Sequence, residues 1–539
     1  MRRIAFPAAV ILCGALFLQL AGRAEHLAQD AGDARRERVG KVNFPTNCSS
    51  SVQGAMEKGL ALLHSFQYEE AEQAFSNAAR VDPNCALAYW GKAMALYEPL
   101  WSFPNEKALA LGREDVAKAE KVGANDSRIR GYIEAAAAFY RDAKLTPAAR
   151  TGAYSAALEK LYKEHPEDNE AGELYALSLI ALAQMGVDDL PNRKKAVAIL
   201  NPIFAQYPEN PGAAHYLIHA TDVRELAPEG LAAARVYAKI APESAHALHM
   251  PSHIFRRLGM WQEVIASNLG SEAAAAQATK EHRGDADYQL HAMDFLNYAY
   301  LQDGEKSKAI ALIAQLKDVP QAQESDIVDA QNQFAARNAV EMHLWKEAAA
   351  LEIPKERFVW QDYTYWTRAI GAARSGDVQG ARAAVQKLTQ VAEMVKATDT
   401  QQKQSGMTAK GMGIDPSEAE AWLDYAEGKP DEALRILRTA AVREDARDEE
   451  PFATPAREML GDLLLELQRP SDALEAYKEV QKNYPNRFNT LYGAARASEL
   501  TGDARGASDF YSKLIANCPA DADRPELQSA RNYLAAHRN

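Results

Sequence analysis

Apolar and small residues recur along most of the chain in paired segments that short polar turns separate. Runs rich in alanine, such as residues 134–139, favour helix. No Asn-Gly or Asp-Gly turn lies between alternating β-branched segments, so the usual signals of β-hairpins are nearly absent. The pattern predicts a protein made almost wholly of helices, an all-α fold.

The first 24 residues have a different pattern. Two arginines precede an apolar run, residues 4–20, and small residues follow it. This layout is typical of a secretory signal peptide. A retained membrane anchor is the alternative, since a run of about 17 residues could almost cross a bilayer, but Pro7 and Gly14 inside it favour the signal. We expect an exported protein, periplasmic or extracellular, without a membrane span after signal removal.

Composition divides the rest of the chain. Residues 25–46 are polar and lack apolar periodicity, which is typical of a flexible leader. Residues 398–413 are rich in Gln, Thr, Gly and Met, and an acidic stretch ends near Pro455, so an insertion is expected there. The predicted order is signal peptide, flexible leader, N-terminal and central helix array, insertion or linker with an irregular helix pair, and C-terminal helix pairs, at residues 1–24, 25–46, 47–400, 401–453 and 454–539.

Small and aromatic residues recur with a period of roughly 34 residues. The offsets of the tetratricopeptide pattern occur first at Gly59, Ala71, Phe75 and Pro83. They recur near the end of the chain at Gly461, Ala473, Tyr477 and Pro485. The chain therefore resembles the tetratricopeptide repeat family. Stretches such as HALHMPSHIFRRLGMW resemble an exported bacterial group of these proteins whose activity is unsettled.

The resemblance implies an α-solenoid in which each repeat is a pair of helices, helix A and helix B. Small residues let the two helices approach, and bulky residues fill the space to the next pair. We expect about twelve pairs, whose A helices begin near residues 52, 86, 128, 169, 211, 245, 290, 329, 362, 414, 454 and 488. The stacked A helices are expected to line a concave groove, which in this family takes extended peptides or partner helices.

Charge and cysteines add two expectations. The formal net charge of −13 argues against nucleic acid, because phosphate binding needs a basic face; we expect a peptide or protein partner. Cys48 and Cys85 each precede an A helix in neighbouring repeats, so both lie at one edge of the array. A disulfide between them is the prediction for an oxidising compartment, and unpaired thiols are the alternative.

Five of the twelve histidines lie within residues 211–268, where we look for function. In the family, positions 2, 5, 9, 12 and 13 of helix A line the groove. In this register His215 and His219 take positions 5 and 9 of one A helix. His249 and His253 take the same positions in the next. Because residues i and i+4 share a helix face, we expect His215 beside His249 and His219 beside His253, in a rough square.

Clustered imidazoles with a nearby carboxylate suit zinc, copper, nickel or iron, and do not suit calcium or magnesium. The candidate metal ligands are His215, His219, His246, His249 and His253. A polar floor whose histidines hydrogen-bond to one another or to a bound peptide is the alternative. The same register gives the candidate ligand-binding residues Trp90, Asp222, Arg256, Arg257, His291, Asp294 and Tyr298. Asp222 or Asp294 could orient a ligand histidine, and for Trp90 packing between repeats competes with ligand binding.

No recognised catalytic signature such as His-Glu-x-x-His occurs in the chain. The leading interpretation is an exported scaffold that binds a peptide, protein or small ligand in its groove, over a floor rich in histidine. A metal-dependent enzyme, hydrolytic or oxidative, that uses the same histidines is the first alternative. A purely structural assembly scaffold is the second. The sequence leaves the metal, the partner or substrate and the oligomeric state open.

Overall fold

The computed structural model describes residues 38–100, 102–281, 286–354, 358–404, 414–448 and 454–537. Within these ranges the chain is helical, with one isolated β-bridge between Glu98 and Ser102, so the predicted all-α class is confirmed. The predicted signal peptide, residues 1–24, lies outside the described residues. In the described part, no helix has both the length and the apolar character that crossing a membrane requires.

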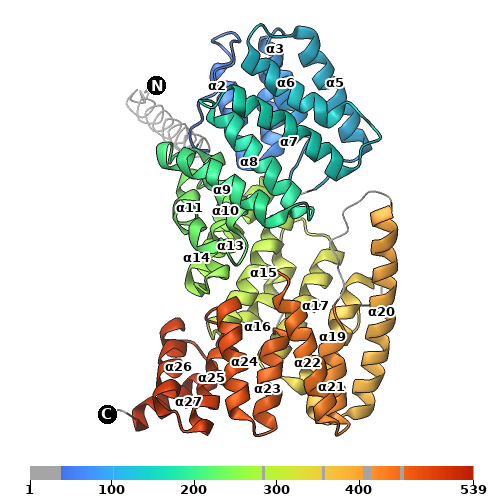
Figure 1. Cartoon of the computed structure of the whole chain (residues 1–539), viewed down its shortest axis with the longest axis vertical. Helices are drawn as coiled ribbons and strands as arrows, with labels where there is room; N and C mark the ends of the chain where they lie inside the picture. Colours follow the sequence, from blue (N-terminus) through green and yellow to red (C-terminus); the bar gives the residue numbers. More distant parts are fainter. Residues whose placement is uncertain are drawn as a thin grey trace, which may run out of the picture.

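The first half of the described chain forms six helix pairs, which lie in the upper part of Figure 1. They are α2 (Gln53–His64) with α3 (Tyr68–Val81), α4 (Ala86–Ala95) with α5 (Glu106–Val122), α6 (Ser127–Tyr140) with α7 (Pro147–Glu164), α8 (Asn169–Gln184) with α9 (Asp189–Gln206), α10 (Pro211–Thr221) with α11 (Ala227–Ile240), and α12 (Ala245–His249) plus α13 (Pro251–Arg257) with α14 (Trp261–Lys280).

Six further pairs follow and form the lower part of Figure 1. They are α15 (Ala286–Gln302) with α16 (Lys306–Gln315), α17 (Glu324–Glu341) with α18 (Trp345–Ala349), α19 (Phe358–Ser375) with α20 (Val378–Gln404), α21 (Ser417–Ala426) with α22 (Pro430–Asp445), α23 (Ala456–Glu466) with α24 (Pro470–Asn483), and α25 (Phe488–Thr501) with α26 (Ala504–Asn517); α27 (Glu526–Ala536) comes last. The largest difference between a predicted and an observed start of an A helix is at α17, which was expected to begin near residue 329 and begins at Glu324.

Glycine and aromatic residues set the close packing of the pairs. The ring of Phe75 on α3 lies between two A helices, where Cβ atoms added at Gly59 and Gly91 would be 2.8 and 2.4 Å from it. Tyr477 on α24 lies in the same way between two glycines of α23 and α25. A larger residue at these glycines would push the helices apart, because protein interiors leave no spare volume. The repeat period seen in the sequence therefore reflects a repeated packing contact.

The A helix of the sixth pair is broken in its middle. α12 ends at His249 and α13 begins at Pro251. Proline has no backbone N–H, so Pro251 cannot donate to the carbonyl of Ala247 as a regular helix requires. The break separates His249 from His253 and lets each half of the helix settle against different neighbours.

The segment expected to be a flexible leader is packed where the structure describes it, residues 38–46. Phe44 is fully buried, and its ring centroid lies 5.6 Å from that of Trp90 and 5.4 Å from that of Tyr132. Lys41 N donates to the carbonyl of Glu209 at 2.9 Å. The flexible-leader prediction is therefore wrong for this stretch, because a few apolar side chains anchor it. Just beyond it, Cys48 and Cys85 form a disulfide that ties this edge to α4.

The C-terminal repeats fold back onto the central ones. Trp261 Nε1 on α14 donates to the carbonyl of Asn486 at 2.8 Å. Arg487 is fully buried and makes ion pairs with Glu341 at 2.6 Å and Glu458 at 3.0 Å. The contacts of Trp261 with Asn486 and of Arg487 with Glu341 join residues more than a hundred positions apart, so the two halves of the array hold each other in place.

The region predicted to be an insertion is more regular than expected. α20 runs to Gln404, across the predicted boundary near residue 400. α21 and α22 form an ordinary antiparallel pair that packs on α19 and α23, so the prediction of an irregular pair is wrong. Residues 405–413 lie outside the described residues. Asp448, placed in a linker by the sequence, pairs with Arg257 at 3.0 Å and thus reaches the central repeats.

Candidate functional site

Six histidines of the central repeats form two groups of three. We call His215, His219 and His246 the closed triad, and His249, His253 and His291 the open triad. Within each triad the ring nitrogens that face one another lie within 4.8 Å, which is close enough to share one ion. α10 supplies two residues of the closed triad, and α13 and α15 supply two of the open one. The short helix α12 contributes one histidine to each, so the triads are neighbours.

The predicted square of four histidines does not form. His215 lies against His246, with 3.0 Å between the two Nε2 atoms. His249 lies against His253, again with 3.0 Å between the Nε2 atoms. The A helices of neighbouring pairs are thus offset by about one turn, so that position 2 of α12 meets position 5 of α10. His291, expected only among ligand-binding residues, completes the open triad.

Hydrogen bonds determine the tautomers of the open triad. His249 Nδ1 lies 2.7 Å from Oδ1 of Asn268, whose Nδ2 donates to the carbonyl of Val264 at 2.8 Å and so orients the amide. His253 Nδ1 lies 3.0 Å from Oδ2 of Asp222. Both acceptors are oxygens, so both Nδ1 atoms carry the proton. In the neutral rings the Nε2 atoms therefore have lone pairs, and these face each other.

Two lone pairs at 3.0 Å repel unless a cation lies between them. A proton on one ring would serve, but burial lowers the pKa of His249 well below its ordinary value, and the charges of His291 and His253 lower it further. Asp222 remains ionised, because Arg257 and His253 outweigh its burial and hold its pKa below the usual range. The cation shared by the two rings is therefore either a metal ion or a proton.

The closed triad is arranged in a similar way but is sealed. His215 Nδ1 donates to the carbonyl of His64 at 2.6 Å, which leaves a lone pair on its Nε2. Burial lowers the pKa of His215 to about 3, against the effect of the His64 carbonyl. His219 Nε2 is buried without a hydrogen-bond partner among the described residues. The ring of Phe66, on backbone with a φ of 58°, stacks on His219 and His246 and covers the site.

The distances are close to those of a shared ion in each triad. Two nitrogens that bind one ion at ~2.0–2.1 Å with a tetrahedral angle lie roughly 3.3–3.4 Å apart, so the facing Nε2 pairs, at 3.0 Å, would separate slightly around it. The triads differ in access. His215 is 0% exposed, whereas His291 is exposed and His253 is half-buried. The closed triad is therefore suited to a fixed structural ion, and the open triad to an ion that solvent or a ligand can reach.

Other predicted ligand-binding residues have varied positions. Trp90 is 1% exposed and packs on Phe44 and Tyr132, so the prediction of ligand contact is wrong and the packing interpretation is correct. Asp222 orients His253, as predicted for one of the two carboxylates. Asp294 instead pairs with Arg337 at 2.8 Å.

The remaining three lie beside the open triad. The guanidinium of Arg256 lies 5.0 Å from the ring centroid of Phe295, and that ring also contacts the triad. Arg256 also lies over the ring of Tyr298 at 4.4 Å, and Tyr298 is buried beneath it. Arg257 binds Asp222 at 2.9 Å. None of the three points to a free binding surface, because each is part of the packing around the triad.

Sequence reasoning passed over one cluster. His64, expected to be structural, lies 2.6 Å from Oε2 of Glu170 and 3.4 Å from Oε2 of Glu173, and all three are buried. Burial, then the charges of Glu170 and Asp168, raise the pKa of Glu173 well above its usual value. Counted from Asn169, the two glutamates take positions 2 and 5 of helix A, so the register applied to the histidines would have found them.

Comparison with known families agrees with the repeat pattern. The tetratricopeptide repeat model matches residues 56–98, 418–488 and 458–522. This chain contains tetratricopeptide repeats. No curated protein matches it.

Two solved structures align with the chain over most of its length. A structure of Naa15/Naa10 bound to HypK-THB is 12% identical, covers 90% of this chain and 92% of that chain, and has a TM-score of 0.24. A human IFIT1 dimer with PPP-AAAA is 13% identical, covers 87% of this chain and 91% of that chain, and has a TM-score of 0.32. Scores this low carry no argument about shape or ligand.

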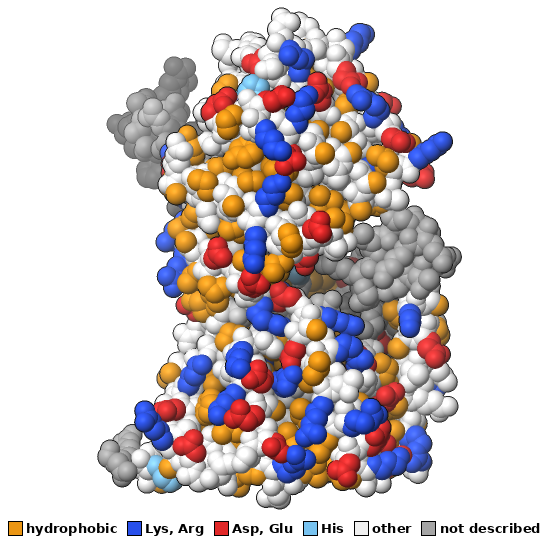
Figure 2. Space-filling view, viewed as in Figure 1, with side chains coloured by type: hydrophobic (Ala, Val, Ile, Leu, Met, Phe, Trp, Pro, Cys, Tyr) orange, Lys and Arg blue, Asp and Glu red, His pale blue; other side chains and the backbone are white. Residues whose placement is uncertain are grey.

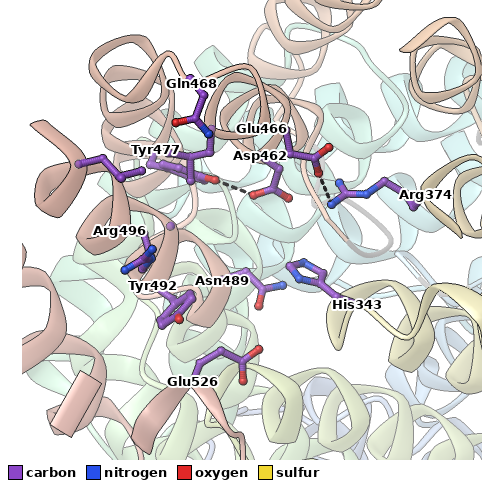
Figure 3. Close-up of a pocket in the computed structure, with 13 residues that line it drawn as sticks. His343, Arg374, Asp462, Glu466, Gln468, Tyr477, Asn489, Tyr492, Arg496 and Glu526 are labelled. Carbon is purple, nitrogen blue, oxygen red and sulfur yellow. Dashed lines mark hydrogen bonds and ion pairs between the residues drawn. The ribbon is translucent and has the colours of Figure 1, made fainter. Parts of the chain in front are cut away.

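A cavity of about 420 Å³ lies in the C-terminal tetratricopeptide repeats, apart from the histidine triads (Figure 3). Counted from Phe488, α25 lines it with helix A positions 2, 5, 9 and 13, which are Asn489, Tyr492, Arg496 and Leu500. Across it, Tyr477 donates to Asp462 at 2.6 Å, and Arg374 pairs with Glu466 at 2.5 Å. These polar groups already have partners, so the cavity suits docking of a partner better than chemistry.

Proposed function

We propose that the chain binds a transition-metal ion at the open triad, within a tetratricopeptide scaffold that engages a peptide or protein partner. Tetratricopeptide repeats support the scaffold role in general terms. The metal site is specific to this chain. His249 and His253 supply two ligands, and His291 supplies the third from the exposed side. The export expected from the N-terminal sequence belongs to the proposal.

One observation carries the metal site: the facing Nε2 atoms of His249 and His253, both of whose Nδ1 atoms are committed as donors. A ligand histidine usually donates its other N–H to a carboxylate or carbonyl, which fixes the ring and raises its basicity. Asp222 and Asn268 fill these two roles. Both rings thus present Nε2, the atom that would bind the ion, to the same point.

The donor set limits the ion. Three imidazoles suit zinc, copper, nickel or iron, whereas calcium and magnesium prefer oxygen ligands. Asp222 is engaged by His253 and Arg257, so it acts on the ring and not on the ion. We therefore expect an ion bound by three nitrogens, with the remaining coordination position open to solvent on the side of His291.

A metal-dependent enzyme, hydrolytic or oxidative, is the second candidate, and the exposure of His291 favours it. A bound ion with an open position acidifies its water and supplies a nucleophile near neutral pH. Asp222 would hold His253 in the ligating tautomer, and Phe295 would keep one side of the site dry.

For the partner, the C-terminal cavity of Figure 3 is the proposed docking place, because it lies on helix A positions. Acidic and basic side chains are interspersed over the face seen in Figure 2, so that face offers mixed polar contacts. A purely structural scaffold is the outcome that remains if neither metal nor triad-dependent binding is found.

The test is metal analysis of protein purified without chelator. In His253→Asn the amide can keep the hydrogen bond to Asp222 but has no nitrogen in place of Nε2. We expect near-stoichiometric transition metal in the wild type and loss of one equivalent in His253→Asn. His537→Asn is the matched control, since His537 is exposed at the end of α27. Absence of metal from the wild type, also after reconstitution with each ion, would eliminate the proposal.

A further inference from the structure

A third group of ionisable side chains lies behind the closed triad. His64 ends α2, and Glu170 and Glu173 lie on α8. Their ligand atoms are within 4.8 Å of one another, and the three residues are 0%, 2% and 0% exposed. The backbone carbonyl of His64 is the acceptor that orients His215, so this group touches the closed triad without sharing a ligand with it.

The hydrogen bonds of the group leave one carboxyl without a partner. His64 Nδ1 lies 2.8 Å from the hydroxyl of Tyr216, and His64 Nε2 lies 2.6 Å from Glu170. Neither oxygen of Glu173 has a hydrogen-bond partner among the described residues. A buried polar group without a partner destabilises the fold, and a charged one does so more strongly. A chain that keeps Glu173 there under such a cost needs a compensating contact.

Protein donors do not reach Glu173 from the nearest backbone. A Cβ at Gly212, in the first turn of α10, would lie 2.2 Å from Oε2 of Glu173 and 2.7 Å from Nδ1 of His64. The backbone N–H groups of Gly212 and Ala213 both point to Oδ1 of Asn210, so the helix cap uses them. A cation placed between the three side chains would supply the compensating contact.

We propose that His64, Glu170 and Glu173 bind a divalent metal cation at a third site, distinct from the histidine triads. One imidazole and two carboxylates suit zinc, manganese or iron, a harder donor set than that of the triads. Two carboxylates balance the charge of the ion, which makes burial of the whole group acceptable. Because none of the three residues is exposed, the ion enters during folding and leaves only when the chain opens.

Burial gives the site a signature in solution. Dialysis of the native protein against a strong chelator should leave this ion in place, and unfolding in guanidinium should release it to a chromophoric chelator. We expect the wild type to release one equivalent more than Glu173→Gln, whose amide keeps the shape but lacks the charge. Glu167→Gln is the control, because Glu167 lies in the turn just before α8 with its side chain 74% exposed, and it should match the wild type.

The same measurement separates this site from the open triad. His253→Asn should lose the equivalent that chelator removes from the native protein, and Glu173→Gln should lose the one that appears on unfolding. If Glu173→Gln releases as much metal on unfolding as the wild type, the proposal is overturned. In that case, a variant at least as stable as the wild type at pH 7 would show that Glu173 simply carries a proton. Should the variant not fold, a wild type that releases no metal on unfolding after dialysis overturns the proposal by itself.

Discussion

Asp222 accepts a hydrogen bond from Nδ1 of His253 at 3.0 Å, and this contact decides which nitrogen of the ring faces His249. The carboxylate itself is held by Arg257 at 2.9 Å. The orientation of the open triad thus depends on a residue that offers no ligand of its own. Contacts of this kind typically change metal affinity by about 10–100-fold when they are removed.

Asp222→Asn should therefore weaken binding of the ion at the open triad by about 10–100-fold without abolishing it. The amide can donate to Nδ1 and so favour the wrong tautomer of His253. Competition with a chromophoric chelator measures the affinity. Asp448→Asn, which also removes a partner of Arg257 but touches no histidine, should leave it within a few-fold. Equal affinities in the wild type and Asp222→Asn would contradict the positioning role.

The pH dependence of the metal-free protein should reveal the buried histidines. Burial lowers the pKa of His215 to about 3, whereas an unfolded histidine titrates near 6.5. Between these values the unfolded chain binds more protons, so stability falls as pH falls from about 6.5, by at most about 1.4 kcal/mol per pH unit for one such residue.

Buried carboxyls act in the opposite direction, because burial raises the pKa of Asp462 to about 7. The comparison must therefore be made between variants. His215→Asn, which can keep the hydrogen bond to the His64 carbonyl, should lose stability less steeply than the wild type between pH 6.5 and 4.5 in denaturant titrations after chelator treatment. If the stability of the wild type and that of His215→Asn fall equally with pH, His215 is not buried in its neutral form.

The packing of the C-terminal repeats against the central ones depends on a buried network of ion pairs. Arg487→Met would leave Glu341 and Glu458 buried without their cation. Loss of one member of such a network typically costs roughly 3–5 kcal/mol. Denaturant unfolding should show this loss, whereas Arg505→Met, on a side chain that is 94% exposed, should change stability by less than about 0.5 kcal/mol. An equally small effect at Arg487 would mean that the C-terminal repeats do not dock as described.

Most of the architecture could be predicted from the sequence, because the repeat period reflects a packing contact between neighbouring helices. Phe75 recurs as Tyr477 since each fills the same gap beside glycine, so the A helices could be placed within a few residues. The packed stretch around Phe44 was missed because three apolar side chains among polar ones form no period, although their burial fixes the segment.

The candidate site was predicted only in part. The register brought His215, His219, His249 and His253 to one region, but their pairing depends on an offset between α10 and α12 that Pro251 and distant packing determine. The His64 carbonyl, about 150 residues before His215, and Asn268 on a B helix choose the tautomers. Such contacts follow from the tertiary fold, which no local pattern encodes.

The most direct test is an anomalous-difference map of crystals of the metal-loaded full chain. Our account predicts a peak roughly 2.0–2.1 Å from Nε2 of both His249 and His253, with His291 turned toward it. An open triad without a peak, in crystals grown with each of zinc, copper, nickel and iron, would contradict the account and leave a shared proton as the cation between the two rings.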